Sequence, residues 1–144
     1  MNKQKPEESF NIREAKGDDF YKIMVVNEAL KNYKDKSHFP WFLLITLDMK
    51  NTLEPYNLPN EEESKILNVI EDNLTSLINE LVPYQYIGRI TDNGKRELYY
   101  YLESPQEIHE KLNILIEKDD YLRDFEYEIS QDPNWENVFY FFDY

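Results

Sequence analysis

The chain has 144 residues, 41% of them hydrophobic and 15% aromatic, which is enough apolar volume for one folded domain without metals or disulfides. It contains no cysteine, which excludes a disulfide framework, thiolate metal ligands and a cysteine nucleophile, and which is typical of a reducing cytoplasm. Its net charge of −13 argues against binding to nucleic acid backbones or to anionic membranes.

The negative charge is concentrated in the last part of the chain. Residues 103–144 hold 12 acidic and three basic residues, a net charge of −9. This favours a basic protein partner, although an acidic surface also serves simply to keep a protein in solution. Residues 1–8 are charged and lack the apolar run of a signal peptide, so we expect a disordered leader there, a single domain over residues 9–144, and a cytoplasmic location.

The first part of the chain predicts three strands. Residues 10–15 and 20–26 form two β-rich runs around a short polar turn, which predicts an N-terminal hairpin. Residues 27–39 are polar and predict an irregular loop. Residues 40–49 place apolar side chains on both faces of a strand, which is typical of a central, covered strand.

A long amphipathic helix follows a loop. Asn60 is suited to be its N-cap, Glu63 stands where it would close a capping box, and the helix should end before Pro83. Apolar residues recur at three- and four-residue spacing. This predicted stripe consists of Ile66, Val69, Ile70, Leu74, Leu77, Ile78 and Leu81.

Residues 84–103 predict a β-hairpin around an Asn-Gly dipeptide at 93–94, the strongest short-range signal for a tight type I′ turn. With this turn, Thr91 lies opposite Arg96 on the neighbouring strand. Gly88 lies inside the first of the two strands, where a glycine often marks a bulge or a close backbone approach.

The remaining residues predict a helix, a strand and a last short helix. Ser104 and Pro105 are typical of the N-cap and first position of a helix. Residues 121–130 alternate apolar and polar side chains, which predicts a half-buried strand, and residues 132–142 predict a short helix. The buried stripe of the first of these helices should consist of Ile108, Leu112, Leu115 and Ile116.

The predicted order is a hairpin, then β-α-β-β-α-β, then a terminal helix. We therefore expect an α+β fold, a ferredoxin-like β-α-β-β-α-β sandwich with an N-terminal β-hairpin extension and a short C-terminal helix. Both long helices should cover the same face of the sheet.

Several motifs in this order resemble the bacterial family called domain of unknown function 695. They are Leu58 to Glu62, Ile70 to Leu74, the hairpin from Tyr86 to Tyr101, Asp132 to Trp135, and the strand entry Pro40-Trp41. The resemblance implies no established activity, cofactor or catalytic residue. In organisation the family is similar to the regulator B-like proteins that inhibit ribonuclease E. Asn57 stands where family members commonly have glycine, and asparagine tolerates a left-handed turn.

Catalytic and metal-binding patterns are weak. The three glycines are too few for a Walker loop or a dinucleotide-binding fingerprint. His38 and His109 have no histidine four residues further on, and Asp119, Asp120 and Asp124 do not have the spacing of an EF-hand loop. We expect no catalytic residue, no metal and no cofactor. Enzymatic activity stays open, with the sequence favouring its absence.

The best candidate for a ligand site lies on the hairpin. Arg89, Thr91 and Arg96 share one face of it, and Glu71 on the preceding helix is suited to bind an arginine there. These four residues predict a small site that attracts anions. The alternative is a purely structural set of ion pairs.

Aromatic side chains predict a partner-binding surface. Tyr99, Tyr101, Trp135 and Tyr140 belong to residue types that are enriched at protein interfaces. The alternative is that these rings form a core where the last helix covers the second face of the sheet.

Three functional hypotheses follow. The first is a non-enzymatic, cytosolic protein-binding or regulatory domain with an acidic, aromatic-rich surface, such as a nuclease inhibitor or an immunity-type protein acting on a basic partner. The second is a small-ligand binder or enzyme with an anion site at Arg89 and Arg96. The third is a structural homo-oligomer formed through the hairpin edge or the aromatic face, and the sequence leaves the oligomeric state unknown.

Overall fold

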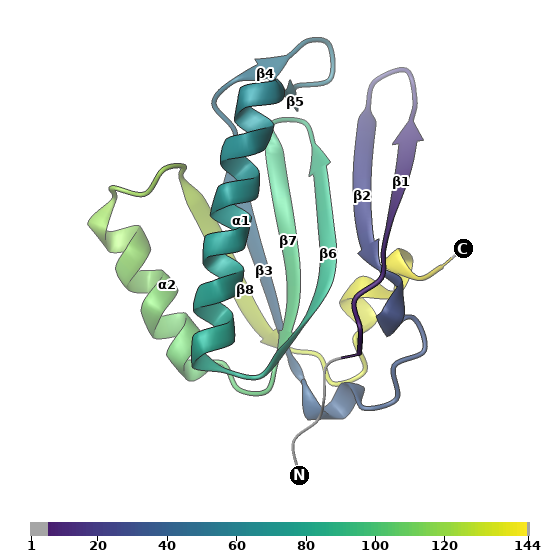
Figure 1. Ribbon diagram of the computed structural model, residues 1–144, viewed down its shortest axis with the longest axis vertical. Coiled ribbons are helices and arrows are strands. Elements are labelled where there is room, and N and C mark those ends of the chain that lie inside the picture. The colour runs from purple at the N-terminus through teal and green to yellow at the C-terminus, as the bar shows by residue number, and fades with distance from the viewer. Residues whose placement is uncertain (1–5, 144) are drawn as a thin grey trace.

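The computed structural model describes residues 6–143, and Figure 1 shows their arrangement. Residues 1–5 of the predicted leader lie outside the described residues, so the leader stays a prediction. The elements in chain order are β1 (Phe10–Lys16), β2 (Tyr21–Asn27), the 3-10 helices η1 (Glu28–Leu30) and η2 (Lys36–His38), β3 (Trp41–Asp48), β4 (Thr52–Leu53), β5 (Leu58–Pro59), α1 (Glu61–Leu81), β6 (Tyr84–Asp92), β7 (Lys95–Leu102), α2 (Gln106–Lys118), β8 (Phe125–Gln131) and the 3-10 helix η3 (Glu136–Phe141).

Six strands form one sheet in the order β1-β2-β6-β7-β3-β8, and each neighbouring pair is antiparallel. α1 connects β3 to β6 across β7, and α2 connects β7 to β8 across β3. Figure 1 shows both helices on the same side of the sheet. The chain is therefore an α+β protein, and the predicted N-terminal hairpin extends the sheet beside β6.

The interior strand β3 is covered along the helix side of the sheet, and at its start it is covered on both faces, where its sequence places apolar residues on both sides. Leu43, Ile45 and Leu47 are fully buried in the core beneath the helices. Phe42, whose side chain points the other way, is buried in a second core on the opposite face. Alternation with period two thus supplies apolar side chains to two cores from one strand.

α1 buries four apolar residues at helical spacing, Leu67, Ile70, Leu74 and Ile78. The prediction that Val69 lies in the buried stripe is wrong, since Val69 is 54% exposed. Each residue turns the helix by about 100°, so the position next to Ile70 faces outward when Ile70 faces the sheet. Sequence spacing alone did not settle which neighbouring apolar residues lie at the centre of the stripe.

The N-terminus of α1 confirms one half of the predicted capping box. Asn60 Oδ1 accepts a hydrogen bond of 2.8 Å from the backbone N–H of Glu63. The other half is wrong, because the Glu63 carboxylate binds Arg123 and the Asn60 N–H donates to the Asn51 carbonyl at 3.1 Å instead. Glu63 is therefore a buried ion-pair partner rather than a surface cap.

α2 begins one residue later than its sequence predicts. Pro105 occupies the N-cap position and no side chain caps this end, so the assignment of Ser104 as the cap is wrong. Ile116 of the predicted stripe is 37% exposed because it lies at the side of the helix rather than towards the sheet.

The second core covers the other face of the sheet at the end where η3 lies. The indole Nε1 of Trp135 donates to the Phe39 carbonyl at 2.9 Å, and its ring stacks on Tyr101 with 4.5 Å between centroids. The buried members of this core are Val26, Leu30, Phe39, Phe42, Ile87, Ile90, Tyr99, Tyr101, Trp135, Val138 and Phe141.

Asp132 holds the turn between β8 and η3. Its carboxylate accepts hydrogen bonds from the Tyr101 hydroxyl at 2.6 Å and from the backbone N–H groups of Glu136 at 3.0 Å and Asn137 at 2.9 Å. The motif from Asp132 to Trp135 therefore has a structural explanation, since it caps η3 and anchors it to β7.

The β6–β7 hairpin has the predicted turn and pairing, with Thr91 opposite Arg96. A bulge interrupts the register between Tyr86 and Gly88, which confirms the prediction made for this glycine. Gly88 has φ of +153°, and a Cβ built on it would collide with the carbonyl oxygen of Val25 on β2. Only glycine lets β2 and β6 approach each other at this point.

We expect Gly88→Ala to lower the free energy of unfolding by more than about 3 kcal/mol, because the new methyl group meets backbone atoms that cannot move independently. Gly94→Ala is the matched control, since Gly94 has φ of +81° but no atom within 4 Å of a built Cβ. The control should cost only about 1 kcal/mol. Urea unfolding followed by circular dichroism measures both, and equal losses would contradict this account of Gly88.

Candidate functional site

The four residues predicted to bind a ligand come together between α1 and the β6–β7 hairpin. Glu71 Oε1 lies 2.7 Å from Arg89 Nη1 and 3.6 Å from Arg96 Nη1. Arg96 Nε donates to Thr91 Oγ1 at 3.1 Å. We call these residues, together with Asn68 and Tyr86, the arginine cluster. Whether it binds a ligand stays a prediction.

Two members of the arginine cluster were missed from the sequence. The Tyr86 hydroxyl donates to Glu71 Oε2 at 2.7 Å, and Asn68 Oδ1 accepts from Arg96 Nη1 at 2.8 Å. Asn68 precedes Glu71 by three residues on one helix, so helical spacing could have identified it. Tyr86 could not be identified in this way. It is three residues from Arg89 in a strand, so both side chains lie on the helix side only because the bulge intervenes.

The arginine cluster holds two guanidinium groups against one carboxylate. Burial, together with the charge of Arg89, lowers the pKa of Arg96 to about 10, which leaves Arg96 charged at neutral pH. Burial and the Glu71 carboxylate raise the pKa of the Tyr86 hydroxyl well above its usual range. The cluster therefore presents fixed positive charge, and Arg89, 26% exposed, is its more accessible arginine.

The residues predicted to bind a partner lie mostly in the second core. Tyr101 and Trp135 are fully buried and Tyr99 is 5% exposed, whereas Tyr140 is 46% exposed. This supports the alternative in which the C-terminal segment uses these rings as core. Tyr140 is the one of the four that a partner can reach without rearrangement of the fold.

A shallow hollow of about 410 Å³ lies on the part of the second sheet face formed by β8, β3 and β7. We call it the acidic hollow. It is lined by Leu44, Thr46, Lys95, Glu97, Glu126, Tyr127 and Glu128. Its lysine already contacts a carboxylate, since Lys95 Nζ lies 2.6 Å from Asp48 Oδ1. Three glutamates therefore remain as the dominant charge.

Glu97 is the most enclosed of these glutamates. Burial and the negative charge of Asp92 raise the pKa of its carboxyl group. The neighbouring Tyr99 on the same strand packs its ring edge-on against Tyr140, with 6.4 Å between centroids. The exposed ring of Tyr140 thus lies close to the acidic hollow. A cationic side chain there would meet the carboxylates and also an aromatic ring.

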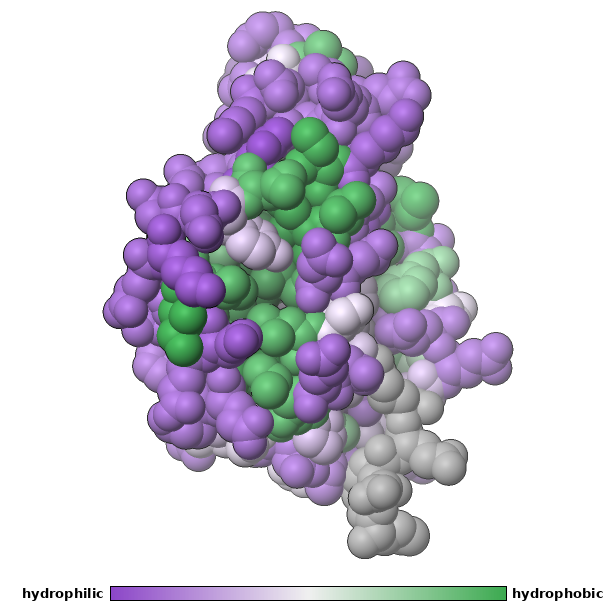
Figure 2. All heavy atoms as spheres, turned by 60° about the vertical axis from the view of Figure 1, so that its left-hand side comes forward, coloured by the Kyte–Doolittle hydropathy of each residue, from purple (hydrophilic) through white to green (hydrophobic). Residues whose placement is uncertain are grey.

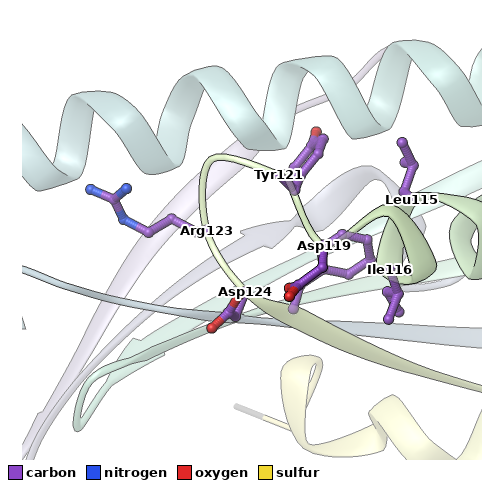
Figure 3. Close-up of a pocket in the computed structure, with 7 residues that line it drawn as sticks. Leu115, Ile116, Asp119, Tyr121, Arg123 and Asp124 are labelled. Carbon is purple, nitrogen blue, oxygen red and sulfur yellow. The ribbon is translucent and has the colours of Figure 1, made fainter.

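A second pocket of about 230 Å³ lies at the end of α2, and Figure 3 shows its lining. Asp119, in a left-handed conformation with φ of 52°, ends the helix there, and Asp124 follows in the loop before β8. Arg123 is directed away from both acids in Figure 3. It binds Glu63 instead, so this pocket combines two carboxylates with the apolar side chains around them.

The contact between Glu63 and Arg123 is a buried bidentate ion pair. Arg123 Nε and Nη2 donate to the two carboxylate oxygens at 2.8 Å and 2.6 Å. Glu63 is fully buried and also accepts from the backbone N–H of Lys50 at 3.0 Å. Chiefly because of the hydrogen bonds from Arg123, the pKa of Glu63 falls to about 2. The pair joins the start of α1 to the loop before β8.

The two histidines make separate local contacts. His38 Nε2 lies 2.7 Å from Glu103 Oε2, and His109 Nδ1 lies 2.8 Å from the Tyr127 hydroxyl. Among residues 6–143, no three histidine, aspartate or glutamate side chains are grouped so as to hold a metal ion. In the same part of the chain, no helix has the length and hydropathy that are needed to cross a membrane.

Apolar side chains are also exposed on the side of the molecule that carries the helices. Figure 2 shows them as patches between hydrophilic regions. Val69 on α1, Ile114 on α2 and Leu122 in the following loop are each about half exposed. This surface differs from the acidic hollow, which lies on the other face of the sheet.

The fold and these surfaces define a small acidic α+β protein built on one antiparallel sheet. A family model described as a family of unknown function (DUF695) matches residues 11–144. The chain therefore belongs to this family, which confirms the resemblance carried by its sequence motifs. Neither the curated proteins nor the solved structures contain a match to the chain.

We expect Glu63→Gln to lower the free energy of unfolding by about 3 kcal/mol at neutral pH, because it leaves the Arg123 charge buried without a counter-charge. Because the pKa of Glu63 falls from 4.5 to about 2 on folding, its contribution is complete above pH 4.5 and is lost as the pH falls towards 2. Urea unfolding over this pH range should show the difference between wild type and variant shrinking.

The control for this prediction is Glu62→Gln, which removes an exposed acid from the same turn of α1. It should change stability by less than about 0.5 kcal/mol. A difference between wild type and Glu63→Gln that is independent of pH would contradict the role given to the ionised carboxylate.

Proposed function

We propose that this chain is a non-enzymatic protein-binding or regulatory domain that recognises a basic partner through the acidic hollow. The observation that carries the proposal is the set of three carboxylates, Glu97, Glu126 and Glu128, around one hollow whose lysine already contacts Asp48. Their negative charge is left to attract a cation from outside. A lysine or arginine of a partner supplies the matching charge.

The physical chemistry of the hollow supports recognition of a cation. Glu97 is partly desolvated, and its carboxylate is repelled by Asp92 and attracted by Lys22 and Lys95. A further positive charge placed beside it would favour its ionised form. Tyr140 offers an exposed aromatic face at the border. The net charge of −13 steers basic proteins towards the surface and makes the association rate fall as salt rises.

One concrete form of this function is inhibition of a nuclease, or immunity to a basic toxin, in the cytoplasm. An acidic surface that covers a positively charged active site blocks it both sterically and electrostatically.

The strand order β8-β3-β7-β6, with α1 and α2 crossing on one side, supports a ferredoxin-like sandwich. That arrangement in turn supports the likeness to regulators of ribonuclease E, as an analogy at the level of fold.

A second candidate function is binding of a small anion at the arginine cluster. Two guanidinium groups share the carboxylate of Glu71, so the cluster carries surplus positive charge within a strongly acidic protein. The partial exposure of Arg89 makes a phosphate or carboxylate ligand sterically possible.

The leading proposal is tested by replacing the three carboxylates of the hollow together, as Glu97→Gln, Glu126→Gln and Glu128→Gln. Wild-type protein should capture one or a few basic proteins from a lysate of its source organism at low salt and release them at high salt. The triple variant should lose them, because it removes the charge that attracts them. Mass spectrometry of the eluates makes the comparison.

The matched control replaces three exposed helix glutamates, as Glu80→Gln, Glu107→Gln and Glu110→Gln, and so changes the net charge equally. It should retain the captured proteins. Capture of the same proteins by wild type and by the triple variant of the hollow would refute the proposed site.

The second candidate is tested by titrating the protein with inorganic phosphate while recording the NMR signal of the Arg96 Nε–H, which stays present when Arg89 is replaced. Saturable shifts that disappear in Arg89→Gln and persist in Lys95→Gln, which removes a cation on the other sheet face, would support an anion site. Shifts that rise linearly with phosphate, or that survive Arg89→Gln, would leave the cluster with a structural role alone.

A further inference from the structure

β8 is an edge strand whose outer backbone groups have no partner in the described residues. It is last in the sheet and pairs only with β3. The Asp48 N–H donates to the Asp124 carbonyl at 2.9 Å, and the Asp132 N–H donates to the Pro40 carbonyl at 2.7 Å. These two hydrogen bonds determine which residues of β8 face β3.

Alternate residues of an antiparallel strand direct both their N–H and their C=O groups to the same side. Because Asp124 and Asp132 face β3, the even-numbered residues between them do so as well. Four odd-numbered residues therefore direct their backbone groups away from the sheet. They are Phe125, Tyr127, Ile129 and Gln131, and within residues 6–143 no hydrogen bond reaches these groups from another element.

The two faces of this edge differ in chemistry. On one face, Glu126 and Glu128 are exposed and line the acidic hollow. On the other, Tyr127 and Ile129 are partly buried against the core beneath the helices. A strand added at this edge would therefore meet carboxylates with one set of alternate side chains and apolar groups with the other.

We propose that the basic partner binds by adding an extended segment to β8, antiparallel to it, with lysine or arginine at alternate positions and apolar residues between them. This inference rests on the proposed function, which it deepens by naming how the partner is held. Backbone hydrogen bonds to the outer groups of β8 supply affinity, and Glu126 and Glu128 select the basic residues on one face.

The same charges disfavour a second copy of this chain as the occupant. Two β8 strands paired with each other would place Glu126 or Glu128 opposite the glutamates of the other copy, and like charges directly opposite are destabilising. Acidic side chains on an edge strand protect it from pairing with itself. They leave it open to a segment of opposite charge.

Synthetic peptides test the alternation directly. The probe is a fluorescent heptapeptide, Lys-Val-Arg-Val-Lys-Val-Arg, and its control has the same composition with the basic residues grouped, Lys-Arg-Lys-Arg-Val-Val-Val. The alternating peptide should bind at least about tenfold more tightly in fluorescence anisotropy at low salt. It should also slow hydrogen exchange at the amides of Tyr127 and Ile129.

Methylation of the peptide nitrogens tests strand pairing. In an antiparallel addition, the residues that hydrogen-bond to Tyr127 and Ile129 lie on the same face as those side chains, which makes them the valines. N-methylation of the valines should abolish binding, whereas N-methylation of the basic residues should leave it nearly unchanged. Equal effects, or loss only when the basic residues are methylated, would overturn the antiparallel pairing.

Variants of the protein separate this inference from the proposed function. Glu126→Gln with Glu128→Gln should weaken the alternating peptide by about tenfold, whereas Glu80→Gln with Glu107→Gln should not. Equal affinity of the alternating and grouped peptides would overturn the edge-strand inference. If wild type, but not the triple variant of the hollow, still captured basic proteins, the proposed function would stand without the edge-strand inference. If neither peptide binding nor capture of basic proteins were seen, both proposals would fail.

Discussion

One extra residue in β6 is the constraint on which the rest of the structure depends. Tyr86 points towards the helices, and simple alternation would send Arg89 to the opposite face of the sheet. The bulge at Gly88 restores Arg89 to the helix side, where it meets Glu71 together with Tyr86. It also lets Ile90 stay in the second core. In a regular strand, the residues on only one side of the bulge would keep their side chains on the correct faces of the sheet. The arginine cluster and both cores could not then form together.

The two faces of the sheet are closed to different extents, and the acidic surface follows from that difference. α1 and α2 cover one face, whereas η3 covers only part of the other. β8 contributes to both, because Phe125 packs into the core beneath the helices while Glu126 and Glu128 point to the uncovered part of the second face. The charge of the C-terminal third is therefore divided. Asp132 is used inside the fold, whereas the two glutamates of β8 remain exposed.

Local signals in the sequence predicted the strands, the long helices and the hairpin register, because turn chemistry and apolar periodicity act over a few residues. The role of Glu63 could not be predicted in this way, since its partner Arg123 is 60 residues away and carries no local pattern. The aromatic residues posed a different difficulty. Tyr101 and Trp135 suit an exposed interface or a core equally well by composition, and only the path of η3 across the sheet places them inside.

The way in which η3 completes the second core has a consequence during protein synthesis. Trp135, Val138 and Phe141 are translated after every strand of the sheet, so the face that they cover stays bare until they leave the ribosome. The core beneath the helices needs no later residue than those of β8. Until η3 packs onto the sheet, Tyr101 and its aromatic neighbours are open to chaperones and to other nascent chains. Protection of these aromatic side chains therefore depends on some of the last residues of the chain to be synthesised.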